Sequence, residues 1–214
     1  PIPRSLHMAL SDLRNFSLIA TPPVDRLPIR TSLARYSQGR IREDILRELR
    51  RGGQVFFVHN RVATIHAVAR ELEDLLPEAR VAVAHGQMDA KELESILVDF
   101  INAKATVLVC TAIIESGVDL PNVNTILVNN ADHFGMAQLY QLRGRVGRSH
   151  VRGYCTLLLE HGKQLSGVAA QRLRALQDNT ALGSGFAVAS ADMDIRGAGD
   201  LLGSKQHGHI QAVG

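Results

Sequence analysis

Short, continuous runs of apolar residues alternate along this 214-residue chain with longer segments whose apolar residues recur every three or four positions. The runs have the length and the Val, Leu and Phe content of buried strands, whereas the longer segments have the period of amphipathic helices. Strands that alternate with helices form parallel βαβ units, in which helices cover both faces of the sheet. We therefore predict an α/β fold with a mostly parallel sheet. The predicted strands cover Val55–Val58, Arg80–Ala84, Thr106–Cys110, Thr125–Val128 and Gly153–Leu159.

Glycine and short polar residues set the expected ends of the helices. The first helix is expected to end at Gly52, where a left-handed C-cap forms easily. Asn60 is predicted to cap the second helix. Asp89, with Glu92 three residues later, resembles a capping box at the start of the third. The predicted helices cover 41–49, 62–76, 89–101, 136–142 and 165–176.

The composition is that of a soluble globular protein, with 45% hydrophobic and 21% charged residues. No membrane association is expected, because the apolar runs fall far short of the roughly 20 residues of a membrane span. Cys110 and Cys155 lie in apolar runs and form no CxxC pair, so we expect reduced packing residues, a cytoplasmic location and no metal site. The net charge of +3 permits nucleic-acid binding without requiring it.

Three regions of the chain differ in their pattern. Residues 1–30 contain five prolines and no clear periodicity, so we expect a linker from an upstream unit. Residues 31–160 carry the alternation of strands and helices and are expected to form the main domain. Residues 161–214 begin with a helical period and then become rich in glycine, which predicts an appendage.

Ligands of parallel sheets bind in the loops that leave the carboxyl ends of the strands. Three segments rich in polar residues or glycine follow predicted strands, at 85–88, 111–122 and 130–149. We therefore expect the functional residues at this edge of the sheet.

The third segment contains the sequence QLRGRVGR over residues 141–148. Arginine donates bidentate hydrogen bonds to phosphate and keeps its charge, and glycine lets the backbone approach a ligand closely. The sequence resembles motif VI of superfamily-two helicases, QxxGRxGR, with every fixed position present. The resemblance implies that Gln141 binds ATP, and that Arg145 and Arg148 are arginine fingers that stabilise charge on its γ-phosphate.

The second segment, TAIIESGVDLPN, resembles motif V of the same helicases. This resemblance implies that Thr111 and Glu115 lie near DNA. It also implies that Gly117 and Asp119 lie near the nucleotide.

The first segment, HGQM, lies between a predicted strand and a capped helix. In the helicases that the chain resembles, this loop follows the DNA backbone, where a helix amino terminus and backbone amides meet phosphate. The resemblance implies that His85 and Gly86 contact DNA. Asn60 lies in the region of motif IV, where a phosphate contact and a helix cap both explain it.

The Gly-rich segment GFAVASADMDIRGAGDLLGSKQHG resembles the element that follows motif VI in RecG-type branched-DNA helicases and in bacterial transcription-repair coupling factors. Arg196 and Gln206 match its signature polar positions, which couple ATP state to movement, whereas His207 departs from the pattern. The segments 17–31, 76–88 and 129–149 are more similar to the coupling factors. The chain thus resembles their second RecA-like translocation domain, with a translocation hairpin and loop at 161–214.

The resemblance implies an ATP-dependent translocase on double-stranded DNA that displaces stalled RNA polymerase and promotes nucleotide excision repair. The polymerase and the repair proteins are expected to bind other domains. The chain holds no GxxxxGK[ST] phosphate loop, so ATP and Mg²⁺ are expected to bind mainly to an upstream RecA-like domain, and the fragment alone to be inactive. Two alternatives remain: a RecG-like branched-DNA helicase, and a non-enzymatic DNA-binding module in which Arg145 and Arg148 only bind phosphate.

Overall fold

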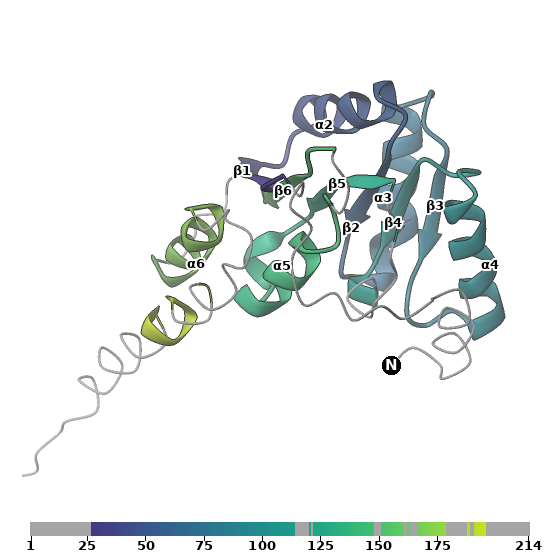
Figure 1. The fold of residues 1–214 in the computed structure, drawn as a ribbon. Helices are drawn as coiled ribbons and strands as arrows, with labels where there is room; N and C mark the ends of the chain where they lie inside the picture. Colours follow the sequence, from purple (N-terminus) through teal and green to yellow (C-terminus); the bar gives the residue numbers. More distant parts are fainter. Residues whose placement is uncertain are drawn as a thin grey trace, which may run out of the picture.

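The computed structural model describes residues 27–113, 120, 122–147, 151–160, 162, 167–178, 188 and 191–195. These residues form a six-stranded sheet, in the order β1-β6-β5-β2-β4-β3, in which every neighbouring pair is parallel (Figure 1). The predicted α/β fold with a mostly parallel sheet is therefore confirmed. The strands are β1 (Arg30–Arg35), β2 (Gln54–Val58), β3 (Val81–Ala84), β4 (Val107–Cys110), β5 (Val123–Val128) and β6 (Tyr154–Leu159).

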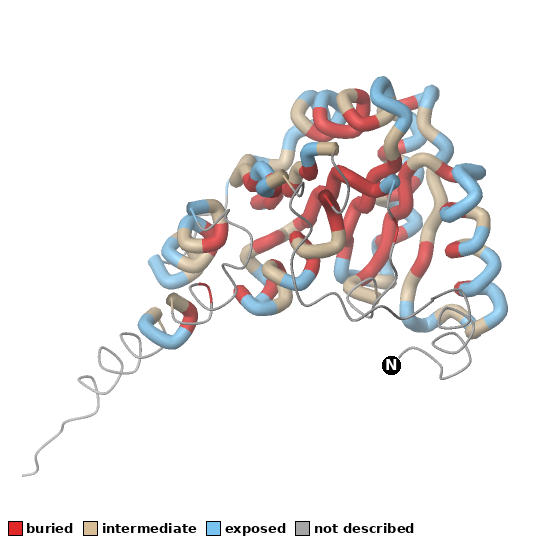
Figure 2. Tube along the Cα trace, viewed as in Figure 1, coloured by how far each residue is buried: buried red, intermediate tan, exposed pale blue. Residues whose placement is uncertain are grey.

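Helices cover both faces of this sheet and make three layers. Alternate side chains of a strand point to opposite faces, and the two faces carry separate hydrophobic cores. Val55 and Phe57 of β2 belong to the core under α2 and α3, whereas Phe56 and Val58 belong to the core under α4, α5 and α6. The four inner strands other than the edge strands β1 and β3 are buried along most of their length, as Figure 2 shows. The described helices are α2 (Gln38–Arg50), α3 (Val62–Leu75), α4 (Ala90–Ile101), α5 (Met136–Arg143), α6 (Gly167–Asp178) and the short 3-10 helix η2 (Ala131–His133).

The predicted helix ends are confirmed at two places and wrong at a third. Gly52 follows α2 with a φ of 76°, in the left-handed region. Asp89 caps α4, because its Oδ1 accepts hydrogen bonds of 2.9 Å from the backbone N–H groups of Lys91 and Glu92. Asn60 does not cap α3, which begins after Arg61 without a side-chain cap.

Strand β1 is not predicted by the sequence. It lies at one edge of the sheet and pairs with β6 from Arg30↔Tyr154 to Arg35↔Leu159. An edge strand is only partly buried, and β1 therefore lacks the continuous apolar run of the central strands.

The cysteines are buried and free, as predicted for packing residues. Burial raises the pKa of both thiols, that of Cys155 to about 12, so neither is a reactive thiolate at neutral pH. Nowhere in the described ranges is a helix both long enough and apolar enough to cross a membrane.

Candidate functional site

Three of the loops singled out by the sequence meet at the carboxyl edge of the sheet. Asn60 follows β2, and its Oδ1 accepts a hydrogen bond of 3.4 Å from the backbone N–H of Ala112, which follows β4. This contact explains why Asn60 does not cap α3: its acceptor serves a neighbouring loop. Gly86 follows β3, and a Cβ built on it would lie 3.5 Å from the side chain of Ile113. The motif IV, HGQM and motif V regions are therefore neighbours.

A buried histidine links the end of β2 to β5 and α3. His59 is 5% exposed, and its Nδ1 lies 3.1 Å from Nδ2 of Asn129, which follows β5. An amide nitrogen only donates, so Nδ1 is the acceptor and Nε2 carries the proton. Nε2 donates at 2.7 Å to Oγ1 of Thr64 in the first turn of α3. Burial, with a smaller effect of Arg61, lowers the pKa of His59, in agreement with this neutral state.

The predicted DNA contacts at this edge differ in their exposure. Asn60 and Gly86 are exposed, and His85 is half-buried with its ring edge-on to that of His66, at a centroid distance of 5.8 Å. Thr111 is 7% exposed, and its backbone N–H donates to the carbonyl of Ala84 at 3.2 Å. Asn60 and the His85 loop therefore offer more surface to a ligand than the Thr111 side chain.

The chain that carries motif VI leaves α5 toward the amino ends of the strands, opposite the carboxyl ends where the motif IV, HGQM and motif V regions meet. Gln141 is exposed on α5, and Arg145 is half-buried just beyond the end of this helix. Gly147 has a φ of 68° and packs against Gly153 and Ile29, which directly precede β6 and β1. The expectation that the whole segment 130–149 lies at the carboxyl edge is wrong for this end of it. The reason is connectivity, because a helix that joins two parallel strands must return the chain to their amino edge.

The two motif VI glycines have structural roles inside the chain. A Cβ on Gly153 would stand 2.8 Å from the Cα of Gly147, so the two backbones touch. The positive φ of Gly147 also disfavours other residues. Gly144 is the C-cap of α5, where a Cβ would lie 3.3 Å from the carbonyl oxygen of Gln141. Close packing therefore accounts for these glycines without a ligand.

No role of Arg143 is predicted from the sequence. It is 4% exposed, and its Nη1 donates at 2.8 Å to the carbonyl oxygen of Leu176 near the end of α6. Its guanidinium also lies 5.0 Å from the ring centroid of Tyr140. Arg143 therefore joins the motif VI helix to α6, the helix with which the predicted appendage begins. The sequence signal for Arg143 is its position inside QLRGRVGR. This signal is ambiguous, because a motif does not distinguish an arginine that binds phosphate from one that packs inside the chain.

The donors of motif VI suit a nucleoside phosphate. The amide of Gln141 and the guanidinium of Arg145 both donate hydrogen bonds, and Arg145 adds permanent charge. Across the described ranges, no three His, Cys, Asp or Glu side chains gather as metal ligands. The donors of motif VI therefore fit phosphate oxygens.

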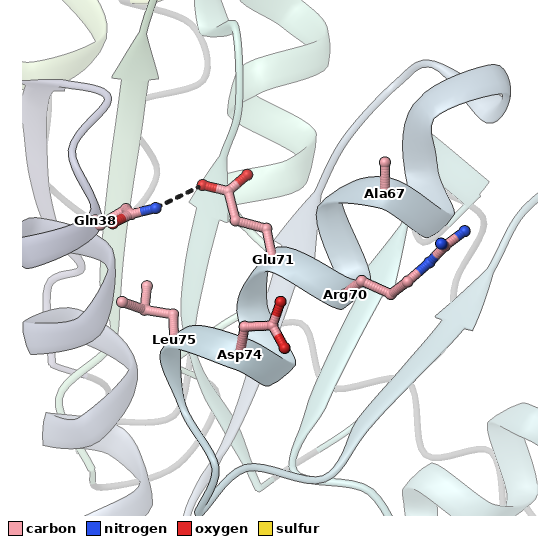
Figure 3. Close-up of a pocket in the computed structure, with 6 residues that line it drawn as sticks. All are labelled: Gln38, Ala67, Arg70, Glu71, Asp74 and Leu75. Carbon is pink, nitrogen blue, oxygen red and sulfur yellow. Dashed lines mark hydrogen bonds between the residues drawn. The ribbon is translucent and has the colours of Figure 1, made fainter.

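Two surface grooves on α2 and α3 contain none of the motif residues. Figure 3 shows the first, where Nε2 of Gln38 donates to Oε1 of Glu71 at 3.4 Å. The hydroxyl of Tyr36 donates to the same oxygen at 3.0 Å. The second runs along α2 beside Arg42, Leu46 and Arg50. These two grooves therefore lie apart from the candidate site.

Six predicted site residues lie outside the described residues. They are Glu115, Gly117, Asp119, Arg148, Arg196 and Gln206. Their expected roles remain predictions.

The chain is similar along its whole length to transcription-repair-coupling factors. It is 51% identical over 214 residues to that of Escherichia coli strain K12, and 52% identical to that of Myxococcus xanthus. In both comparisons the whole of this chain is aligned, but it spans only 19% and 18% of the relatives' lengths. The similarity therefore concerns about a fifth of each relative.

Solved structures show the same fold. A structure of RecG bound to a three-way DNA junction matches 90% of this chain and 25% of the RecG chain, with 31% identity and a TM-score of 0.69. Domain 2 of the DEAD-box helicase Mss116p, bound to an RNA duplex, matches 70% of this chain and 59% of its own, with 19% identity and a TM-score of 0.56, which shows the fold alone. The family profile of the helicase conserved C-terminal domain matches residues 40–150, more than half of the chain. The chain therefore belongs to the helicase conserved C-terminal domain family.

Proposed function

We propose that this chain is the second RecA-like half of the ATP-dependent DNA translocase of a transcription-repair coupling factor. The observation that carries the proposal is identity of about half over all 214 residues to such factors, in a chain that carries the full QLRGRVGR sequence at the end of α5. In this function the whole protein moves on double-stranded DNA, displaces stalled RNA polymerase and promotes excision repair in the cytoplasm. The polymerase and repair proteins bind other domains of it.

Arg145 and Arg148 act on phosphate in this proposal. ATP with Mg²⁺, held mainly by an upstream RecA-like domain, supplies the phosphoryl group. The two guanidinium groups donate hydrogen bonds to phosphate oxygens and stabilise the negative charge that builds in the transition state. The nucleotide is also bound by Gln141, Gly117 and Asp119, which belong to the same chain as Arg145 and Arg148.

The carboxyl edge contacts the DNA backbone. Asn60 uses its Oδ1 for Ala112, so its Nδ2 is left to donate, and donors are what phosphate oxygens require. His85, Gly86, Thr111 and Glu115 complete this surface. Contacts with the phosphate backbone carry no base information, so binding is nearly independent of sequence.

The test is DNA-stimulated ATP hydrolysis by the full-length protein, wild type beside Arg148→Ala and Arg145→Ala. Loss of an arginine finger is expected to lower turnover by about 10³-fold or more. Circular dichroism and the melting temperature serve as controls for folding. If both folded variants keep the wild-type turnover, this domain takes no part in hydrolysis. Only the alternative of a non-enzymatic DNA-binding module would then remain.

The appendage is proposed to couple hydrolysis to movement through Arg196 and Gln206. Arg196→Ala is expected to retain much of the ATP turnover and to lose displacement of a third strand from a DNA triplex. A normal rate of triplex displacement would contradict this role.

A RecG-like branched-DNA helicase is the second candidate, because the RecG structure matches 90% of the chain. Branched and linear duplexes distinguish the two. Stimulation of ATP turnover by a three-way junction far above that by linear duplex would favour the RecG-like function.

A further inference from the structure

Helix α2 carries two buried carboxylates, one turn apart, on the face that packs on the sheet. Asp44 and Glu48 are both 0% exposed and, being four residues apart, share the face of the helix that packs on the sheet. A buried carboxylate is tolerated only when it is paired and hydrogen-bonded. The partners of the two carboxylates lie in different parts of the chain.

Asp44 ties α2 to the middle of a strand. Its Oδ2 accepts hydrogen bonds of 2.8 Å from Thr156 Oγ1 and from Arg40 Nε. Its Oδ1 lies 2.8 Å from Nη1 of Arg47, whose guanidinium stacks 3.9 Å from the ring centroid of Tyr154. All these partners belong to α2 or to β6 itself.

Glu48 ties α2 to the chain that leaves motif VI. Its Oε2 accepts hydrogen bonds from Thr125 Oγ1 and from Arg51 Nη2. The same Nη2 of Arg51 donates at 2.9 Å to the carbonyl oxygen of Arg152. A Cβ on Gly53 would overlap the Glu48 carboxylate, so the second glycine after α2 makes room for this carboxylate. Arg152 lies four residues after Arg148 and directly before Gly153.

Both ends of the segment that carries Arg148 are therefore held at one place. Gly147 and Gly153 touch through their backbones, and Arg51 holds the carbonyl beside that contact. Only five residues lie between the two glycines. The chain that leaves motif VI at Gly147 and the chain that enters β6 at Arg152 are therefore both placed by contacts with Gly153 and Arg51.

We propose that Glu48 and Arg51 are positioning residues for the arginines of motif VI. This inference rests on the proposed function, in which Arg145 and Arg148 act on phosphate. Arg51 acts through the Arg152 carbonyl, and Glu48 orients Arg51. Misplacement of a catalytic group by about 1 Å costs up to about 10²-fold in rate, so the pair affects turnover without touching ATP.

The test compares Arg51→Met with Asp44→Asn in the full-length protein. Both substitutions disturb a buried ion pair of α2, but only the first releases Arg152. We expect Arg51→Met to lower the DNA-stimulated kcat about 10- to 100-fold and to change the KM for ATP by less than about threefold. Asp44→Asn is expected to lower the melting temperature at least as much and to keep kcat within about twofold of wild type. Equal losses of kcat in the two variants would overturn the inference.

A double-mutant cycle separates positioning from general damage. If Arg51 acts only through motif VI, adding Arg51→Met costs less turnover in the Arg148→Ala or Arg145→Ala background than in wild type. Losses that multiply fully in both backgrounds would overturn the inference. Arg51→Lys is expected to recover part of kcat, because one ammonium reaches one of the two acceptors of Arg51.

The variants also keep this inference distinct from the proposed function. If Arg51→Met does not fold, Glu48→Gln replaces it, with an expected loss of about 3- to 10-fold and the same lack of additivity with Arg148→Ala. A collapse of turnover in Arg148→Ala with wild-type turnover in Arg51→Met or Glu48→Gln would sink the positioning role alone. Wild-type turnover in both Arg148→Ala and Arg145→Ala would sink the proposed function itself.

Discussion

The loops at the carboxyl ends of the strands (the carboxyl edge) and those at the amino ends (the amino edge) are held together by different interactions. At the carboxyl edge, side chains join the loops through neutral hydrogen bonds, as His59 does with Asn129 and Thr64. At the amino edge, the exit of motif VI is held by backbone contact between Gly147 and Gly153 and by the charged pair of Glu48 and Arg51. Side-chain hydrogen bonds can be replaced by other donors and acceptors, whereas touching backbones leave no room for any side chain. The two edges should therefore respond differently to substitution, to DNA and to pH.

The largest effect is expected at the amino edge, from Gly153→Val. The new side chain would collide with the Gly147 backbone, and such overpacking costs about 1–3 kcal/mol of unfolding free energy. ATP turnover should fall as well, because the exit of motif VI moves. The melting temperature and turnover of the full-length protein measure both effects. Gly135→Ala is the control, since nothing lies within 4 Å of a Cβ there, and a comparable loss in this variant would contradict the account.

At the carboxyl edge, His59→Leu is expected to cost about 1–3 kcal/mol of local stability, because the buried Asn129 amide loses its acceptor. Amide hydrogen exchange in β2 and β5 of the full-length protein measures this loss. His59→Gln, which both donates and accepts, should recover part of the protection. Equal protection in the Leu and Gln variants would show that hydrogen bonding is not what holds this edge.

Asn60 separates the structural and DNA-binding roles of the same edge. Asn60→Asp keeps an acceptor for the Ala112 N–H but replaces the outward donor by negative charge. We expect DNA affinity to fall about 3- to 10-fold in Asn60→Ala and further in Asn60→Asp, with kcat at saturating DNA unchanged. Fluorescence anisotropy with labelled duplex measures the affinities. Stronger binding by the Asp variant than by the Ala variant would show that Asn60 faces no phosphate.

The smallest effect is a dependence of stability on pH at the carboxyl edge. The pKa of His59 is lowered in the folded protein, so the unfolded chain takes up a proton first as pH falls. The contribution of His59 is complete above about pH 6.5 and is lost progressively below it, with a slope of at most about 1.4 kcal/mol per pH unit. Hydrogen exchange in β2, corrected for intrinsic rates, should show this slope in wild type. His59→Gln should lack it, and an identical slope in that variant would assign the dependence to another group.

The fold was predictable where short-range chemistry decides it. The continuous apolar runs of β2 and β4 require burial on both faces, and Asp89 has the amides of its own helix within reach. The same reasoning failed for Asn60, because its partner is the backbone of Ala112, 52 residues further along the chain. No local pattern distinguishes a helix cap from a contact at that distance.

The site was predictable as motifs but not as an arrangement. The arginines and glycines of QLRGRVGR identify the segment, yet the edge at which it ends follows from the short crossover helix α5. The roles of Glu48 and Arg51 have no sequence signal, since charged residues on a helix usually face solvent. Their burial depends on Thr125 and Arg152, which reach α2 only in the folded sheet.

The pairing of β1 with β6 has a consequence for the time at which the domain is completed. β1 is the first described strand along the chain, and its neighbour in the sheet is the last, with Arg35 opposite Leu159. During synthesis β1 leaves the ribosome long before β6 exists, whereas β2, β3, β4 and β5 find one another earlier. Until Leu159 has emerged, β1 and the open side of β5 present unpaired backbone to other nascent chains. The emergence of β6 closes that interval, and it also brings Arg152 and Gly153 to the exit of motif VI.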